Sequence, residues 1–168
     1  MTHIEVSERG QTIAYSFEDM MKYHGPGSPG GVAQAFKVME RAFAVLSPDG
    51  PPPRREISVH TSFGGPGARD GFEAVTRAMT GERYTVDAAL ARPELGRERE
   101  RFVFVLECGE RSVTLVVRDG IIDPEFIDLV RTEGRTDEQK ERLEVLKAEL
   151  AERTMAAAAA DVYDIDES

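Results

Sequence analysis

Two histidines of this chain each begin a glycine-rich segment that leads into an expected helix. The first segment runs from His24 to Gly31 and the second from His60 to Gly67. Imidazoles are the natural general bases near neutral pH and the commonest metal ligands in proteins. Free N–H groups at a helix start attract carboxylate or phosphate, and glycine lets the backbone approach a ligand closely. The pattern therefore predicts proton transfer or metal binding beside a small anion.

We expect the two loops to meet over one shared pocket. The side chains expected to line it are His24, Ser28, His60, Ser62, Arg69 and Asp70. Two alternatives stay open at this point. A glycine- and proline-rich segment before a helix is often only a turn. Ser28 could serve as a nucleophile beside His24, although the sequence supplies no evident third member of a triad.

The elements expected to carry these loops alternate between helix and strand. Ser16 suits the N-cap of the first helix because two acidic residues follow it. Apolar residues at three- and four-residue spacing predict helices over 17–23, 32–46 and 70–79. Apolar and polar alternation predicts strands over 57–63, 84–90, 102–108 and 112–118. The last two strands flank Gly109 and Glu110 and are expected to form a hairpin.

The C-terminal part is expected to be helical and then acidic. A short helix should begin at Pro124, and Thr136 with Gln139 has capping-box spacing for a longer one. The longer helix carries an apolar stripe that could pack on the domain or on another copy of the chain, namely Leu143, Leu146 and Leu150.

The element order predicts an α+β fold with a mixed sheet in one domain over 1–168. The expected parts are a core over about 16–120, a helical extension over about 123–160 and an acidic tail over 161–168.

Composition limits the partners and the compartment. The chain has 168 residues, of which 40% are hydrophobic, so a folded core is expected. A net charge of −10 opposes nucleic-acid binding. The single cysteine, Cys108, excludes an internal disulfide and a multi-cysteine zinc ribbon. No apolar run reaches the ~20 residues that cross a membrane and no signal-peptide core is evident, so a cytoplasmic location is expected.

Two stretches resemble the FmdE-like family, which is named after a component of formylmethanofuran dehydrogenase. The run Tyr23-His24-Gly25-Pro26-Gly27-Ser28-Pro29-Gly30 resembles the family's Phe-His-Gly-His-x-Cys-Pro-Gly opening. The run Asp70-Gly71-Phe72-Glu73-Ala74-Val75-Thr76 resembles its second element, Asp-Ala-Ile-Gln-x-x-Thr-Gly-Cys. The hairpin over 102–117 and the late helix before Val162 and Tyr163 also fit, so the resemblance covers most of the chain from about residue 16.

The resemblance implies an α+β protein, usually dimeric, with a zinc-like divalent metal held by histidine and cysteine of the two loops. Family members accompany molybdenum or tungsten oxidoreductases that transfer formyl groups. This sequence departs from the pattern where ligands are expected, with Pro26, Ser28 and Ala78 in place of a histidine and two cysteines. A remaining set of His24, His60 and Asp70 would suit a weaker or harder metal, or the metal is lost and the pocket reused.

We therefore expect a divergent member of this family with one of two functions. As a small-molecule enzyme, it would use His24, His60 and Ser28 in catalysis on a carboxylate-like anion. The residues expected to hold that anion are Ser62, Arg69, Gly30 and Gly31. As a non-catalytic accessory protein of an oxidoreductase complex, it would have structural loops and would dock through the Leu143–Leu150 helix. A homodimer is expected in either case.

Overall fold

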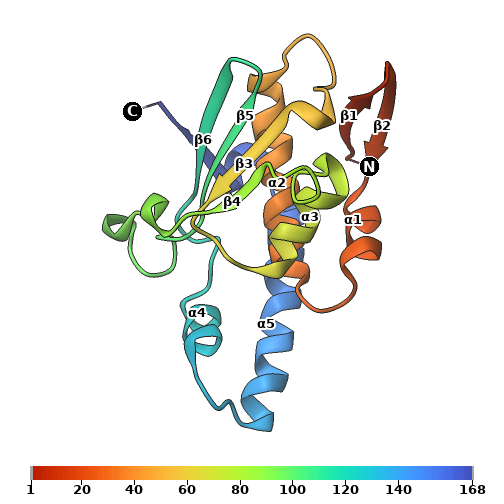
Figure 1. The fold of residues 1–168 in the computed structure, drawn as a ribbon. Helices are drawn as coiled ribbons and strands as arrows, with labels where there is room; N and C mark the ends of the chain where they lie inside the picture. Colours follow the sequence, from red (N-terminus) through yellow and green to blue (C-terminus); the bar gives the residue numbers. More distant parts are fainter. Residues whose placement is uncertain (1, 168) are drawn as a thin grey trace.

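A mixed five-stranded sheet lies at the centre of the protein (Figure 1), whose computed structural model describes residues 2–167. In spatial order its strands are β4 (Tyr84–Val86), β3 (Ile57–Thr61), β5 (Val103–Cys108), β6 (Arg111–Val117) and β7 (Tyr163–Asp166). The β3 and β4 strands are parallel, and the other neighbours are antiparallel. The predicted α+β class, mixed sheet and β5–β6 hairpin are confirmed.

Helices cover one face of this sheet. The side chains of Ile57, Val59 and Thr61 are fully buried beneath α2 (Pro29–Leu46) and α3 (Pro66–Thr76). Successive side chains of a strand point to opposite faces, so the alternate residues of β3 point away from these helices. The apolar alternation in the sequence therefore sets which face of β3 enters the core.

The residues in the first turn of each helix explain where these helices begin. The short α1 (Phe17–His24) starts with a capping box between Ser16 and Asp19, as the Ser16 cap led us to expect. Both α2 and α3 begin earlier than predicted, because Pro29 and Pro66 occupy their first turns. Proline is favourable there, since its ring presets the backbone angle and the first N–H groups have no helical partner. The glycine-rich loops are correspondingly shorter.

The β3–α3–β4 segment is a crossover between parallel strands. Its loop at 62–65 lies at the carboxyl end of β3, directly before α3. The predicted strand over 84–90 is shorter than expected, because its second half forms the 3-10 helix η2 (Ala88–Leu90). Two other 3-10 turns are η1 (Arg54–Glu56) and η3 (Pro93–Leu95).

A helical arm, formed by α4 (Pro124–Arg131) and the first half of α5 (Asp137–Ala156), projects from the sheet and its helices (Figure 1). The capping box predicted from Thr136 and Gln139 is present. Leu143 and Leu146 are buried against Leu129 of α4, whereas Leu150 belongs to the main core. The apolar stripe of α5 thus packs within the chain, which is the first of the two predicted alternatives, and these three leucines are not free to dock another protein.

The N-terminal hairpin and the C-terminal strand were not predicted. The hairpin consists of β1 (Ile4–Glu8) and β2 (Gln11–Tyr15), joined at Arg9 and Gly10. Both turn residues have positive φ, at 52° and 79°, as a two-residue hairpin turn requires. Two short strands with mixed polarity give little periodic signal, which explains why the hairpin was missed.

The segment expected to be only an acidic tail, over 161–168, has regular structure from residue 161 to residue 166, where it forms the end of α6 (Ala159–Val162) and β7. Tyr163 is fully buried, and its hydroxyl donates to Gln34 Oε1 at 2.7 Å. The Gln34 amide in turn donates to Thr154 Oγ1 at 2.9 Å, so one buried chain of hydrogen bonds ties β7 to α2 and α5. Burial raises the pKa of Tyr163 well above its ordinary value.

Within residues 2–167, no helix combines the length and the apolar character needed to span a lipid bilayer.

Candidate functional site

The two glycine-rich loops meet, as predicted, but their glycines contact protein. A Cβ added at Gly67 would lie 2.3 Å from the Ser28 carbonyl oxygen, and one at Gly31 would lie 2.9 Å from the Ala68 nitrogen. A Cβ at Gly30 would lie 2.9 Å from Leu150 Cδ2. These glycines therefore allow α2 to pack closely against α3 and α5. The Cα atoms of Gly30 and Gly31 thus face protein, and their expected role in holding a substrate stays a prediction.

His24 is fixed at the junction of the loops by hydrogen bonds from both ring nitrogens. Its Nδ1 lies 2.8 Å from Asp70 Oδ2, and the backbone N–H of Ser28 donates to its Nε2 at 3.0 Å. Since Nε2 accepts, the neutral ring carries its proton on Nδ1 and donates it to Asp70. The imidazole is only 7% exposed. The ring therefore connects the end of α1 to the starts of both following helices.

Arg69 and Tyr84 lie on the Asp70 side of this junction. Arg69 Nε is 3.3 Å from Asp70 Oδ1, and the arginine side chain is about half exposed. The Tyr84 ring packs near Phe72, with 6.0 Å between ring centroids. Its hydroxyl is buried and has no hydrogen-bond partner among the described residues. Burial raises the pKa of Tyr84 to about 12, Arg69 opposes the shift and Asp70 adds to it.

The buried Tyr84 hydroxyl gives a testable pH dependence. An unfolded tyrosine ionises near pH ~10, so between that pH and about 12 the folded chain holds a proton that the unfolded chain loses. Ionisation of Tyr84 therefore leaves the free energy of unfolding unchanged below pH ~10 and lowers it as pH rises toward 12, by about 2–3 kcal/mol in total. Urea unfolding of Tyr84→Phe should show a shallower alkaline loss than wild type. At pH 7 the variant should be more stable by about 1 kcal/mol, because an unpaired buried hydroxyl is removed.

The matched control is Tyr23→Phe, because Tyr23 is 57% exposed. It should leave the alkaline profile unchanged. An identical alkaline slope for Tyr84→Phe and wild type would contradict the burial of that hydroxyl.

His60 lies on the opposite face of the sheet from this junction. It alternates with Val59 and Thr61, which face the helices, and its Nε2 is 3.0 Å from Glu107 Oε1. The two side chains are 38% and 48% exposed. The expectation that His24 and His60 share one pocket is therefore wrong. The strand alternation already contained this information, because a polar residue between two core residues must point away from the core.

Ser62 and Ser28 make hydrogen bonds within the chain itself, and their expected roles stay predictions. The Ser62 hydroxyl donates to the Arg101 carbonyl at 2.8 Å and so fixes the chain before β5. Ser28 is the N-cap residue of α2, but its side chain makes no capping hydrogen bond. The structure supplies an Asp70–His24 pair next to Ser28, yet the Nε2 lone pair is taken by the serine's backbone N–H. A nucleophilic serine would need that lone pair for its own hydroxyl proton.

The donor set does not fit the metal ion that the family resemblance implies. Both nitrogens of His24 already have partners, Ser28 offers a neutral hydroxyl, and His60 lies across the sheet. Zinc sites take three or four thiolate, imidazole or carboxylate ligands. Within residues 2–167, no group of three or more His, Cys, Asp or Glu side chains is arranged to hold a metal ion.

Sequence reasoning missed two arginines at the end of α3, of which Arg54 is buried and Arg83 is partly exposed. Arg54 donates to the carbonyls of Ala74 and Val75 at 3.0 and 2.9 Å, and Arg83 donates to the Thr76 carbonyl at 3.0 Å. Cations at a helix C-terminus satisfy its unpaired carbonyls and its dipole. Desolvation lowers the pKa of Arg83. These arginines have a structural role, and no periodic signal marks them because their partners are backbone atoms of another element.

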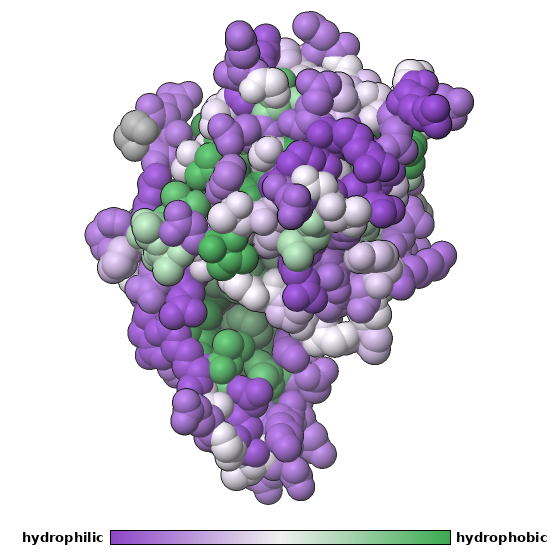
Figure 2. Space-filling view, viewed as in Figure 1, coloured by the Kyte–Doolittle hydropathy of each residue, from purple (hydrophilic) through white to green (hydrophobic). Residues whose placement is uncertain are grey.

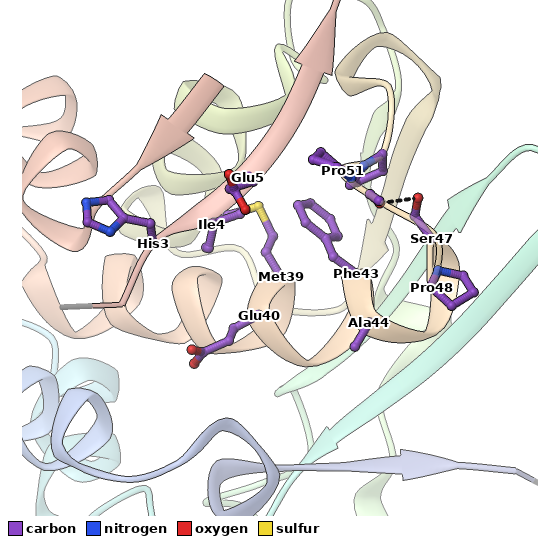
Figure 3. A pocket seen from close by; sticks show the side chains of 12 residues that line it. His3, Ile4, Glu5, Met39, Glu40, Phe43, Ala44, Ser47, Pro48 and Pro51 are labelled. Carbon is purple, nitrogen blue, oxygen red and sulfur yellow. Dashed lines mark hydrogen bonds between the residues drawn. The ribbon is translucent and has the colours of Figure 1, made fainter. Parts of the chain in front are cut away.

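A separate cavity of about 280 Å³ lies away from both loops, between β1, α2 and the segment 47–52 (Figure 3). None of the residues predicted from the sequence to form a site lines it.

Comparisons with known proteins do not assign the chain to a family. No family model matches it, and no curated protein matches it. The resemblance to the FmdE-like family stays a prediction.

Proposed function

We propose that this protein is a non-catalytic accessory protein that works by binding another protein. The observation that carries the proposal is the state of His24: both ring nitrogens are hydrogen-bonded, and the ring is 7% exposed. A general base needs a free lone pair within reach of a substrate proton. Here that lone pair accepts a backbone N–H, so the imidazole acts as a clamp between loops.

The packing of the glycines supports the same function. A phosphate- or carboxylate-binding loop needs its N–H groups and the space above them free for the ligand. The space beside Gly67 and Gly31 is occupied by the backbone of the facing helix. The two motif-like stretches thus meet through structural contacts, among them the pairing of His24 with Asp70.

The outer surface of the helical arm, apart from its buried leucine stripe, is a second place where a protein partner could bind. Glu125 of α4 accepts two hydrogen bonds from Arg142 of α5, both at 2.8 Å. Arg131 pairs with Glu100 at 3.1 Å, and Arg97 pairs with Asp128, so the arm is also tied to the segment before β5. Figure 2 shows apolar residues in the hollow between α4 and α5. A projecting element held by several ion pairs is suited to recognition because little order is lost on binding.

The decisive variant is His24→Gln. A glutamine amide can donate to Asp70 and accept from the Ser28 N–H, but it cannot act as a base and is a poor metal ligand. We expect His24→Gln to complement a deletion of the gene and to co-purify with the same partner protein as wild type. Tagged protein should be isolated under native conditions from the organism that carries the gene.

Failure of a folded His24→Gln protein to complement the deletion, while it still captures its partner, would overturn the proposal in favour of catalysis. Stoichiometric zinc in wild type that is lost in His24→Gln would favour a metal site instead. Absence of any co-purifying protein would also count against an accessory function.

A further inference from the structure

The outer edge of β1 is only partly paired. The two-residue turn at Arg9 and Gly10 makes Glu8, Val6 and Ile4 the residues that bond to β2. The backbone groups of the alternate residues, Ser7 and Glu5, therefore point to the other edge. Ser7 uses this edge, since its N–H donates to the Pro52 carbonyl at 2.8 Å and it forms a parallel bridge with Pro53.

The pairing stops at Glu5. Pro51 and Pro52 have no N–H to donate, and the chain turns away at residues 47–50, where Ser47 Oγ donates to the Gly50 carbonyl at 2.6 Å. The outward N–H and C=O of Glu5 make no hydrogen bond within residues 2–167. Residues 52 and 53 thus already pair with β1 beside Ser7. The outer edge of Glu5, the next position along β1 that faces this side, has no backbone partner among the described residues.

The cavity of about 280 Å³ lies at this open position (Figure 3). Met39 and Phe43 of α2 lie at its apolar side, where Met39 is buried and Phe43 is 8% exposed, and prolines 48, 51 and 52 bound its end. Small-molecule sites usually measure ~300–1,000 Å³, so this space is at their lower limit and has room for an inserted side chain. A strand added beside Glu5 would direct alternate side chains toward Met39 and Phe43 and toward solvent.

The charges at the groove favour a basic ligand. Glu5 is exposed and has no ion-pair partner among the described residues, whereas Glu40 is paired with Lys37 at 3.0 Å. The whole chain carries a net charge of −10, which attracts cations at long range.

We propose that this groove binds an extended segment of a partner protein, in which an apolar residue is flanked by lysine or arginine. The segment pairs as a strand with the N–H and C=O of Glu5, its apolar side chain enters the cavity against Met39 and Phe43, and a neighbouring cation lies at the Glu5 carboxylate. This inference rests on the proposed accessory function and names the surface and the partner chemistry.

Substitutions at Glu5 separate the backbone and charge contributions. Glu5→Pro removes the outward N–H and the carboxylate together without removing a β1–β2 hydrogen bond, and Glu5→Gln removes the charge alone, so the difference between these two variants reports the backbone contribution. Thr12→Pro controls for placing a proline on the open edge of β2. Glu5→Lys reverses the charge, and Glu94→Lys, at another exposed site, alters net charge equally.

The probe is a fluorescein-labelled peptide, Lys-Val-Arg-Leu-Lys-Val-Arg, and its comparison replaces every lysine and arginine by glutamate. Fluorescence polarisation should be measured at about 0.15 M salt, where distant charges are screened. We expect saturable binding of the basic peptide with a dissociation constant below about 1 mM, and binding of the acidic peptide at least about tenfold weaker.

Glu5→Pro should weaken the basic peptide about tenfold, whereas Thr12→Pro should change it less than about twofold. Glu5→Lys should reduce the preference for the basic peptide, and Glu94→Lys should leave it nearly unchanged. The proposal that the groove binds a basic segment would be wrong if Glu5→Pro and Thr12→Pro bound the basic peptide equally, or if wild type showed no saturable binding of it.

Two measurements separate this proposal from the broader one. If Glu5→Pro still captures the native partner, the groove is wrong while the accessory function stands. Sedimentation of wild type and Glu5→Pro tests a second copy of the chain as the occupant. If wild type is a dimer and Glu5→Pro is a monomer, the groove is occupied by a second copy of this chain and the proposed partner segment is wrong.

Discussion

Replacement of Gly67 by alanine is expected to destabilise the protein by about 3 kcal/mol or more. The new Cβ would lie 2.3 Å from the Ser28 carbonyl oxygen and 3.0 Å from the Val32 nitrogen. Both are backbone atoms at the start of α2, so no side chain can rotate to make room. The start of α3 would have to move away from α2, and the hydrogen bonds of His24 between the two loops would stretch with it.

Urea unfolding followed by circular dichroism measures this effect, and Gly64→Ala is the matched control. Gly64 belongs to the same loop, but an added Cβ there meets nothing within 4 Å. The control should lie within about 0.5 kcal/mol of wild type. If Gly67→Ala proves as stable as Gly64→Ala, then α2 and α3 are not in close contact at Gly67. That result would favour the alternative that the glycine-rich loop binds a ligand.

Replacement of His24 by alanine is expected to lower the free energy of unfolding by about 2–4 kcal/mol. Asp70 would lose its imidazole donor at 2.8 Å, and the Ser28 N–H would lose its acceptor at 3.0 Å. Hydrogen bonds to ionised groups contribute more than neutral ones, and a partner left unsatisfied in a buried place adds a desolvation cost. His24→Gln should recover part of the loss, because its amide can replace both contacts.

His60→Ala provides the comparison, because His60 also pairs with a carboxylate but on an open face of the sheet. Exposed pairs contribute at most about 1 kcal/mol, so this variant should unfold near the wild-type urea midpoint. Equal destabilisation by the two alanine substitutions would show that the His24 contacts carry no special weight. A larger effect at His60 would contradict the burial difference between the two rings.

Local signals in the sequence predicted the helix ends and the main strands. Ser16 and Thr136 form their capping boxes within four residues of chain, so their contacts follow from local spacing. The apolar alternation from Ile57 to Thr61 predicted β3 in the same way. The proximity of His24 and Asp70 was also predicted, and it is confirmed because the two loops lie at the starts of α2 and α3, which pack side by side.

The errors concern mainly residues whose role depends on distant partners. The predicted loops include Pro29 and Pro66, although each proline suits a first helical turn. The C-terminal segment is acidic and polar in composition, yet Tyr163 lies in the core because Gln34 and β6 supply its partners from far along the chain. Composition alone does not reveal a partner separated by more than a hundred residues.

The sequence by itself determined the α+β class, the helix caps and the two places where glycines gather. Only the tertiary structure decided what those glycines and histidines do. A glycine leaves space, and space is filled by a ligand or by the protein according to how closely two helices approach. A histidine is free or engaged according to what faces its two nitrogens. Both conditions are set by long-range packing, which brings Ser28 and Asp70 to His24 and turns His60 to the other face of the sheet.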